Sequence, residues 1–238
     1  PFDERWFKIY LWDFLFYDQN LPHTRHLPED FDLKKLVALY YGMTTWVDDM
    51  VGRLMYNLQR HGLSDNTIVL FVSDHGDNLG SHHRFNKGLI IEESIRIPMI
   101  FHSTEHWSSR IISDQVAQLI DVMPTLVTTC GGELPASVQG RDLSPTLTGD
   151  RSCLDDTDAI IETSGGQIGL RTPNQLAGIQ LDDDLCRASN SGHCLYDLEA
   201  DPYEWNNLLD PFEAGTTNPL IERLVRWNEE TPWLTDRA

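Results

Sequence analysis

The spacing of hydrophobic positions predicts one long helix near the start of the chain. Over residues 32–61, apolar side chains recur three and four positions apart, as on one buried face of an α-helix. Gly62 follows directly and predicts the end of this helix. The predicted buried face consists of Leu36, Leu39, Tyr40, Met43, Val47, Val51, Leu54 and Leu58.

Short, uniformly apolar runs alternate with helical patterns in the first part of the chain. Residues 9–16, 67–72 and 95–101 are predicted to be buried strands, and the second is expected at the centre of a sheet covered on both faces. Residues 116–130 have a helical pattern that Gly131 ends. The order strand, helix, strand, loop, strand, helix is typical of an α/β fold.

The pattern changes after Gly149. Short strand candidates are separated by turn residues there, and one helix is predicted near the end, which indicates a small antiparallel subdomain with a terminal helix. We therefore predict two domains, residues 1–149 and residues 150–238. The strand candidates are residues 159–162, 169–171, 177–180 and 194–196, and the helix covers residues 220–228.

Composition narrows the classes of partner. The chain has 238 residues, a net charge of −19 and a pI near 4.6, which argues against nucleic acid and against anionic membrane surfaces as partners. No apolar run is long enough for a membrane span. A small anionic substrate remains compatible, because a metal ion and a few basic groups create local positive charge. The chain begins with Pro1 and without a signal-peptide pattern, so we expect a processed chain or a piece of a longer one.

The four cysteines do not form a C-x-x-C pair, so a zinc knuckle is not predicted. Cys186 and Cys194 lie eight positions apart, and both a small disulfide loop and two free thiols agree with that spacing. The acidic run of residues 182–184 is predicted to be a solvated turn rather than a metal loop.

The candidate chemistry lies where the strand of residues 67–72 ends. Ser73-Asp74-His75-Gly76 follows it, and ligands of open α/β sheets bind at the carboxyl ends of strands. Asp74 offers a hard oxygen ligand, His75 offers a nitrogen or a proton, and Gly76 permits a tight turn. Lys87, twelve residues after His75, could contact a bound anion as a point charge. The alternative is an ordinary turn, in which Asp and Gly are also common.

Further motifs surround this loop in a fixed order, and together they resemble the sulfatase family over roughly residues 8–210. That resemblance implies an α/β fold that forms part of an alkaline-phosphatase-like sandwich, a mixed sheet flanked by helices, plus the small C-terminal antiparallel subdomain. The motifs are Leu21-Pro-His23, Trp46-Val-Asp-Asp-Met-Val-Gly-Arg53, the D-H-G loop, Lys87-Gly88, Glu92-Glu-Ser-Ile-Arg-Ile-Pro98, Ile120-Asp-Val-Met-Pro-Thr125, Gly140-Arg-Asp-Leu143 and Leu195-Tyr-Asp-Leu-Glu-Ala-Asp-Pro-Tyr-Glu204 with Asn207-Leu208.

The resemblance also implies roles for five residues in hydrolysis of an anionic small-molecule or carbohydrate sulfate ester. Asp74 and His75 match metal ligands, although the second position is Asn in many members. Lys87 matches a lysine that contacts the transferred group, and His23 matches a candidate proton donor to the leaving group. His82 matches a motif histidine in the substrate site. Family members usually hold Ca²⁺, and Mn²⁺, Zn²⁺ and Fe²⁺ are the alternatives, because imidazole suits softer metals.

One part of the family pattern does not occur in the 238 residues. The family's nucleophile is a cysteine in C-x-P-S-R that is oxidised to formylglycine, and neither Cys130 nor Cys153 fits this pattern. The resemblance therefore predicts a carboxyl-terminal portion that is inactive alone and needs an amino-terminal portion of the same protein. The alternatives are a phosphonate or phosphate ester hydrolase of the same superfamily and a non-catalytic sulfatase-like fragment.

Overall fold

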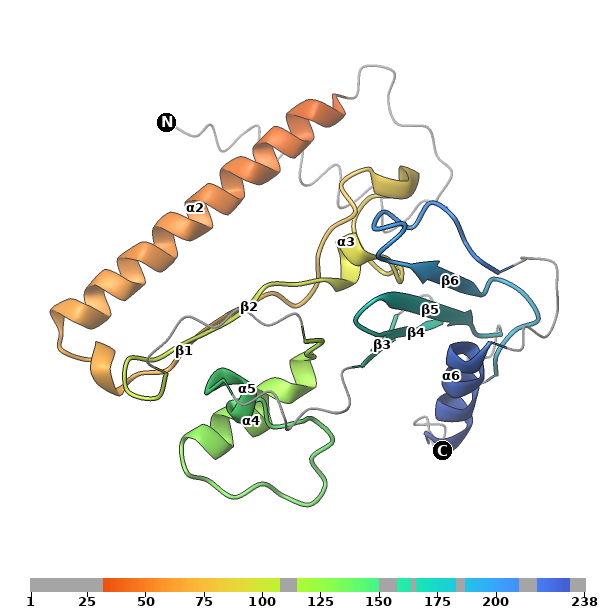
Figure 1. Cartoon of the computed structure of the whole chain (residues 1–238). Helices are drawn as coiled ribbons and strands as arrows, with labels where there is room; N and C mark the ends of the chain where they lie inside the picture. The colour runs from red at the N-terminus through yellow and green to blue at the C-terminus, as the bar shows by residue number, and fades with distance from the viewer. Residues whose placement is uncertain are drawn as a thin grey trace, which may run out of the picture. The chain divides into compact units, whose positions relative to one another are not determined.

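The computed structural model describes residues 32–107, 115–149, 158–163, 166–182, 187–209 and 218–231 (Figure 1). The chain divides into two compact units, Pro1–Ser64 with His75–Lys87 and Asp65–Asp74 with Gly88–Ala238, and each is described here by itself. The predicted strand of residues 9–16, and the loop with His23, lie outside the described residues. The boundary between residues 149 and 150 stays a prediction.

The first unit contains the predicted long helix, α2, which spans Leu33–Arg60. The Asp32 side chain caps its start by accepting a hydrogen bond of 3.1 Å from the Lys35 N–H. At the other end Gly62 adopts a left-handed φ of 67°, and the Leu63 N–H donates to the Leu58 carbonyl at 2.9 Å. This is a Schellman ending, and it confirms the predicted stop at Gly62.

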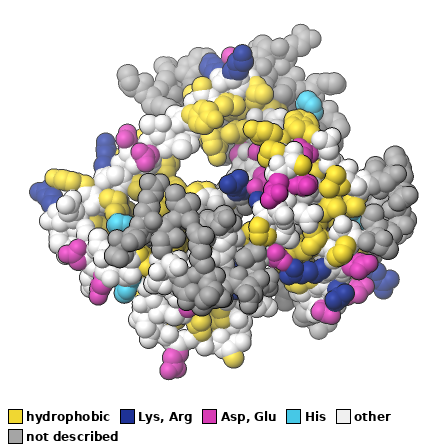
Figure 2. Space-filling model, in the orientation of Figure 1, with side chains coloured by type: hydrophobic (Ala, Val, Ile, Leu, Met, Phe, Trp, Pro, Cys, Tyr) yellow, Lys and Arg dark blue, Asp and Glu magenta, His cyan; other side chains and the backbone are white. Residues whose placement is uncertain are grey.

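The predicted burial of the α2 face is wrong. Leu36 is the one buried residue of the helix, whereas Val47 and Leu54 of the predicted face are 40% and 53% exposed. The other five residues of that face are half-buried. Hydrophobic side chains accordingly reach the surface in the space-filling view (Figure 2). Periodicity specifies a helix with an apolar face, but it does not specify what covers that face. Among the described residues, no helix combines the length and apolar content needed to cross a bilayer.

The second unit begins with a short 3₁₀ turn, η1 (Ser64–Asn66), at the junction with the first, and with a two-stranded ladder. Strand β1 (Val69–Val72) pairs antiparallel with β2 (Met99–His102), with Val69 opposite His102. Strand β1 falls within the predicted run of residues 67–72, and β2 overlaps the predicted run of residues 95–101. The expected central position of β1 is not seen, because among the described residues it pairs with β2 alone and Phe71 is 36% exposed.

Two predicted elements begin later than expected because of proline. The run of residues 95–101 forms a strand only from Met99, after the short helix α3 (Glu92–Ile95), since Pro98 lacks the N–H that a ladder requires. The predicted helix of residues 116–130 becomes a 3₁₀ turn, η3 (Leu119–Asp121), and then α4 (Val122–Thr129). Pro124 fits the first turn of α4, but it could not donate to residue 120 in a longer helix. The last short helix before residue 150 is α5 (Ser144–Leu147).

A four-stranded antiparallel sheet, hereafter the C-terminal sheet, confirms the predicted strands after residue 158. Its order is β3 (Ala159–Glu162), β4 (Gln167–Arg171), β5 (Gln175–Gln180) and β6 (Cys194–Asp197). The predicted terminal helix is α6 (Pro219–Glu230), whose start is capped by the Asn218 side chain accepting from the Leu220 N–H at 2.9 Å.

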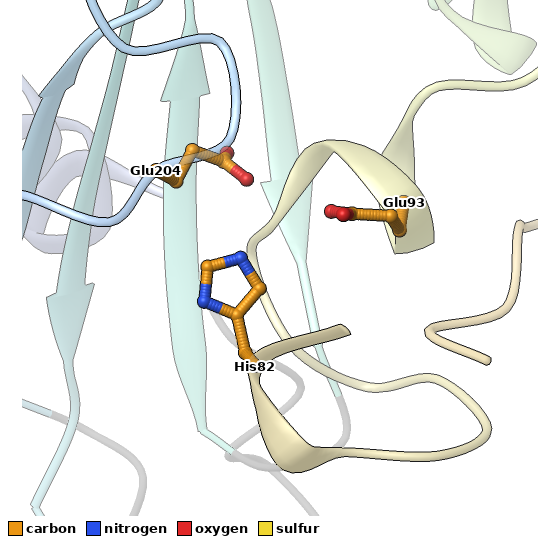
Figure 3. A group of neighbouring side chains, drawn as sticks. All are labelled: His82, Glu93 and Glu204. Atoms are coloured by element: carbon orange, nitrogen blue, oxygen red, sulfur yellow. The ribbon is translucent and has the colours of Figure 1, made fainter. Parts of the chain in front are cut away.

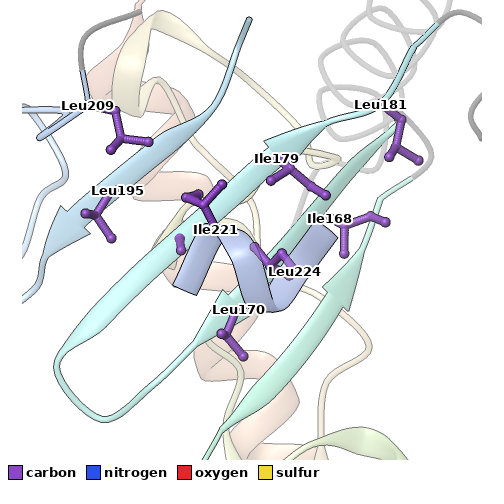
Figure 4. Close-up of a cluster of buried hydrophobic side chains, with 9 residues drawn as sticks. Ile168, Leu170, Ile179, Leu181, Leu195, Leu209, Ile221 and Leu224 are labelled. Carbon is purple, nitrogen blue, oxygen red and sulfur yellow. The ribbon is translucent and has the colours of Figure 1, made fainter. Parts of the chain in front are cut away.

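Helix α6 covers one face of the C-terminal sheet and closes its core (Figure 4). Leu224 and Ile221 from the helix pack against apolar side chains of the strands and of the turn at Leu209. Burying each such side chain stabilises the fold by about 1.5–3 kcal/mol. The sheet and its following turns contribute Ile168, Leu170, Ala177, Ile179, Leu181, Leu195 and Leu209.

Candidate active-site loop and its anchor

The D-H-G segment leaves the end of β1 in a conformation that fixes one imidazole nitrogen. His75 Nδ1 lies 2.7 Å from the Gly76 carbonyl oxygen. Since a carbonyl can only accept, Nδ1 carries the proton in this contact, and the lone pair lies on Nε2. The neighbouring Asp74 carboxylate accepts a long hydrogen bond of 3.5 Å from the Ser73 hydroxyl. Both Asp74 and His75 are exposed, so their donor atoms are accessible.

The loop between His75 and Lys87 is closed by its own backbone hydrogen bonds. The Asn78 N–H donates to the Asn86 carbonyl at 2.7 Å, and the Gly80 N–H donates to the Arg84 carbonyl at 2.8 Å. The Asp77 carboxylate also accepts from the Leu79 N–H at 2.8 Å. The result is a compact loop that contains the 3₁₀ turn η2 (Ser81–His83).

Left-handed backbone is concentrated in this loop. Leu79, His82, His83 and Asn86 have φ values of 44°, 52°, 57° and 66° without being glycine. Such a conformation costs roughly 1–2 kcal/mol per residue, so the surrounding contacts must hold it in place. Strain of this kind occurs preferentially at functional sites, and His82 is one of the predicted site residues.

The five predicted site residues do not all lie in one described unit of the chain. His75, His82 and Lys87 belong to the first compact unit, and Asp74 belongs to the second. Lys87 is exposed at the end of the loop, and His82 is half-buried. His23 lies outside the described residues. The metal-binding and catalytic roles of these residues therefore stay predictions.

The segment that follows Lys87 is anchored on the C-terminal sheet. Ile90 and Ile91 are both buried. Gly169 of β4 leaves room for Ile90, since a Cβ at this glycine would lie 2.7 Å from Ile90 Cγ2. The Ile90 N–H also approaches the Gln167 side-chain oxygen at 3.4 Å. The two isoleucines thus fix the chain three residues after Lys87.

Two polar interactions extend this anchor to α3. Arg171 of β4 holds the Glu92 carboxylate along one edge of its guanidinium, donating from Nε at 2.8 Å and from Nη2 at 3.2 Å. The Glu92 N–H donates to both carboxylate oxygens of Glu204 at 3.1 Å. Bidentate pairs of this kind fix direction as well as distance. Sheet, helix and the turn after β6 therefore meet at Glu92.

Glu204 is a buried acid with an altered pKa. Its side chain is only 2% exposed, and burial together with the nearby charges of Glu92 and Glu93 raises the pKa of this carboxyl to about 7. The Glu92 N–H and Arg171 act in the opposite direction. Carboxylate oxygens of Glu93 and Glu204 lie within 4.8 Å of each other and point toward one another (Figure 3). His82, also labelled there, belongs to the other compact unit.

The motif of residues 195–208 builds the turn that presents Glu204. Asp197 accepts from the N–H groups of Glu199 and Ala200, and Asp201 accepts from the Asn206 N–H at 2.7 Å. Asn207 ties the end of the turn to β6 by accepting from the Leu195 N–H at 2.9 Å. The motif residues are thus mainly structural. Their repeated Asp and Asn letters were a signal for Asx turns, but nothing in the sequence linked Glu204 to Glu92 or Arg171.

Burial also affects two groups on β6. It raises the pKa of the Cys194 thiol and of the Tyr196 phenol, each to about 12, and the charge of Glu204 adds to both shifts. Cys194 is therefore a neutral, unreactive thiol at ordinary pH. Its predicted disulfide partner, Cys186, lies outside the described residues, so the pairing stays open.

A second buried carboxylate joins two further motifs. Asp121 is fully buried and accepts from the Arg141 backbone N–H at 2.7 Å and from Arg141 Nη2 at 2.8 Å. Gly140 permits this approach, because a Cβ there would lie 1.9 Å from the Ile120 carbonyl oxygen. The Thr125 hydroxyl accepts from the Leu143 N–H at 2.9 Å. Residues 120–125 and 140–143 are therefore one structural unit.

One polar cleft of about 360 Å³ lies between this unit, β3 and α6. Its charged groups largely satisfy one another: Arg141 pairs with Asp121, and Arg223 pairs with Asp158. The Gln118 side chain bonds to the Ile160 N–H at 3.1 Å. The cleft is thus held together by its own contacts, which favours a structural role.

Comparison with known proteins agrees with the predicted family. The family model "Sulfatase" matches residues 13–132, about half of the chain. An arylsulfatase of Clostridium perfringens is 34% identical over 196 residues, which cover 81% of this chain and 40% of the relative. The chain spans roughly 40% of the length of the curated relatives it matches.

Solved structures agree as well. The sulfatase-like protein yidJ of Bacteroides fragilis superposes with a TM-score of 0.72 at 28% identity, over 87% of this chain and 46% of that one. A protein determined in complex with its substrate D-glucosamine-2-N,6-O-disulfate superposes with a TM-score of 0.58 at 28% identity, over 77% of this chain and 37% of that one. The predicted alkaline-phosphatase-like α/β fold is confirmed by the first likeness. The chain belongs to the sulfatase family.

Proposed function

We propose that this chain forms the metal- and anion-binding part of a sulfuric ester hydrolase. The observation that carries the proposal is the D-H-G loop at the end of β1, followed by the strained loop and Lys87, in a chain of the sulfatase family. Side chains at a strand end converge on ligands in α/β folds. The strained loop between them keeps His82 and Lys87 in a defined conformation.

Asp74 and His75 would hold a divalent metal ion. A carboxylate oxygen and an imidazole Nε2 with its lone pair are suitable donors, and the Nδ1 contact with Gly76 fixes the required tautomer. Ca²⁺ is coordinated by about 6–8 oxygen atoms, so two residues supply only part of its coordination shell. Ca²⁺ is the first choice, with Mn²⁺, Zn²⁺ or Fe²⁺ as alternatives. When bound, the ion neutralises charge on the non-bridging oxygens of the ester.

The basic residues of the site would stabilise the negative charge on the sulfuryl group and on the leaving oxygen. The Lys87 ammonium would bind a non-bridging oxygen of the sulfuryl group as a point charge. His23 would give a proton to the leaving oxygen, since an imidazole near neutral pKa can act as a general acid. His82 would contact the substrate. No residue of the chain is assigned as the nucleophile.

The substrate we propose is a sulfated carbohydrate. A related protein, 28% identical over most of this chain, was determined with a disulfated glucosamine as its substrate. The strong negative charge of the chain does not oppose this choice, because a metal ion and Lys87 would neutralise the sulfate locally.

A phosphonate or phosphate ester hydrolase is the second candidate. The observation that favours it is His75, whose imidazole is a better ligand for Zn²⁺, Mn²⁺ or Fe²⁺ than for Ca²⁺. Elemental analysis of the purified protein, together with kcat/KM for an aryl sulfate and for an aryl phosphonate, separates the two. Calcium with a preference for sulfate supports the first candidate, and a transition metal with a preference for phosphonate supports the second.

Lys87→Ala tests the proposed role of the lysine directly, in the protein at its full encoded length. Removing one positioned charge in this kind of site lowers kcat by about 10²–10³-fold, so most aryl sulfate hydrolysis should be lost while thermal unfolding is unchanged. Lys34→Ala, an exposed lysine near the start of α2, is the matched control and should behave as the parent. An unaltered kcat/KM in Lys87→Ala would refute the role.

A further inference from the structure

The segment that follows Lys87 is attached to the C-terminal sheet by contacts that could not be predicted from the sequence motifs. We propose that the C-terminal sheet acts as a clamp that positions Lys87, with Arg171 and Glu204 as its polar positioning residues. The inference rests on the proposed function of Lys87, but the clamp itself can be tested without activity. Neither residue is expected to touch the substrate.

The apolar half of the clamp is short and close to Lys87. Gly88 has a left-handed φ of 100°, and Ile90 and Ile91, which follow after Leu89, are buried. Ile90 fits over Gly169, where a Cβ would come within 2.7 Å of its side chain. Only Gly88 and Leu89 separate Lys87 from this fixed point, so the covalent connection between Lys87 and Ile90 is short.

The polar half of the clamp sets direction. Two hydrogen bonds from Arg171 hold the Glu92 side chain, and the Glu92 N–H donates to the Glu204 carboxylate. Three chain segments that are distant in sequence thereby meet at one residue. The Glu92 and Arg171 side chains are 13% and 18% exposed, so little water can replace these contacts. Glu204 itself belongs to the turn that Asp201 and Asn207 build, and its N–H donates to the Asp201 carbonyl at 3.2 Å.

This arrangement explains why a sulfatase-family chain has a buried acid at position 204. A glutamate in such surroundings is unfavourable for stability alone, because burial opposes its charge. Its carboxylate is also the acceptor that fixes the first residue of α3. Functional segments are held in place by supporting side chains that are fixed by their own hydrogen bonds, and Glu204 supports Glu92 in this way.

The decisive experiment compares two arginine–carboxylate pairs of the C-terminal region in the full encoded protein. Arg171→Lys keeps the charge but loses the two hydrogen bonds along one guanidinium edge to Glu92. Arg223→Lys makes the same substitution at the ion pair between Arg223 of α6 and Asp158. We expect Arg171→Lys to lower kcat for aryl sulfate hydrolysis by about 10- to 100-fold with little change in KM, since small displacements of a positioned group have such effects. Arg223→Lys should leave kcat within about twofold of the parent.

A double-mutant cycle separates positioning from general damage. In a Lys87→Ala background, Arg171→Lys should add less than about a threefold further loss, because the two changes act through the same side chain. Full additivity of the two losses would overturn the clamp. Equal kcat losses in Arg171→Lys and Arg223→Lys would overturn it as well.

Hydrogen exchange supplies a readout that needs no catalysis. Arg171→Lys should speed exchange at the Asn78 and Gly80 amides, whose hydrogen bonds close the Lys87 loop, and Arg223→Lys should not. Unchanged protection of these amides refutes the clamp. Absence of sulfate ester hydrolysis in the parent protein instead refutes the proposed function, and in that case the exchange result alone decides whether the clamp exists.

Discussion

Helix α2 and the C-terminal sheet show that the regularity of a sequence pattern does not decide how deeply its residues are buried. The apolar positions of α2 follow a clear helical period, yet Leu36 is the only buried residue of the helix. The strands of the C-terminal sheet are shorter and their patterns are weaker, yet Ile168 and Leu170 of the strands and Leu224 of the covering helix α6 are completely buried. Periodicity therefore indicates which element forms, whereas burial depends on a partner element such as α6.

The largest expected contrast is between Leu224 of α6 and Leu54 of α2. Leu224→Ala removes a side chain with no exposed surface and should lower the free energy of unfolding by about 2–5 kcal/mol. Leu54→Ala truncates the same side chain where it is 53% exposed and should change that energy by no more than about 0.5 kcal/mol. Chemical denaturation of both variants, followed by circular dichroism, gives the two values.

Equal losses in the two variants would contradict the comparison. They would show that Leu54 is covered in solution, so that α2 has a packed face after all. Trp46→Ala then identifies how far such a covered face extends, since Trp46 is also exposed on the helix.

The same two regions show which features the sequence could predict. The helix α2, its stop at Gly62 and the strands β3 to β6 follow from period, glycine and turn residues, which act locally. The antiparallel partner of β1 and the exposure of α2 did not follow, because both depend on contacts between segments distant in sequence. Pro98 and Pro124 were local signals for later element starts that the hydrophobic pattern outweighed.

The candidate site divides in the same way. The loop of residues 73–88 could be predicted from its residue types, because Asp, His and Lys follow a strand and ligands bind at the carboxyl ends of strands. Its anchor was not found, because Arg171, Glu92 and Glu204 are separated by long stretches of sequence and make contact only in the fold. Glu204 belongs to a sequence motif, but the motif does not predict that its side chain is buried.

An intermediate effect is expected from pH, because the surroundings of Glu204 at the C-terminal sheet alter the pKa of its carboxyl strongly. Burial raises the pKa of Glu204 from its ordinary value of 4.5 to about 7. The folded protein therefore binds this proton more tightly than the unfolded chain does. The contribution of this proton to the free energy of unfolding is complete below pH 4.5 and is lost as the pH rises through 7. Above that pH, the stability no longer changes because of Glu204.

Glu204→Gln should remove this slope. Relative to the parent, the variant should become progressively more stable between pH 5 and pH 8, as measured by urea denaturation at both values. Glu199→Gln, at an exposed position of the turn after β6, is the matched control and should follow the parent at both pH values. The shift at Glu204 is refuted by a stability difference between variant and parent that does not change with pH.

The smallest contrast lies in the helix caps. Asp32 caps α2 through the Lys35 N–H at 3.1 Å, and Asn218 caps α6 through the Leu220 N–H at 2.9 Å. Replacing either cap by Ala should cost about 0.5–2 kcal/mol.

For Asn218→Ala the loss should appear in global unfolding, because α6 forms part of a closed core. For Asp32→Ala it should appear as faster hydrogen exchange in the first turns of α2, with global unfolding nearly unchanged, because an exposed helix end opens locally. Global destabilisation of the same size in both variants would show that α2 and the C-terminal sheet unfold as one cooperative unit.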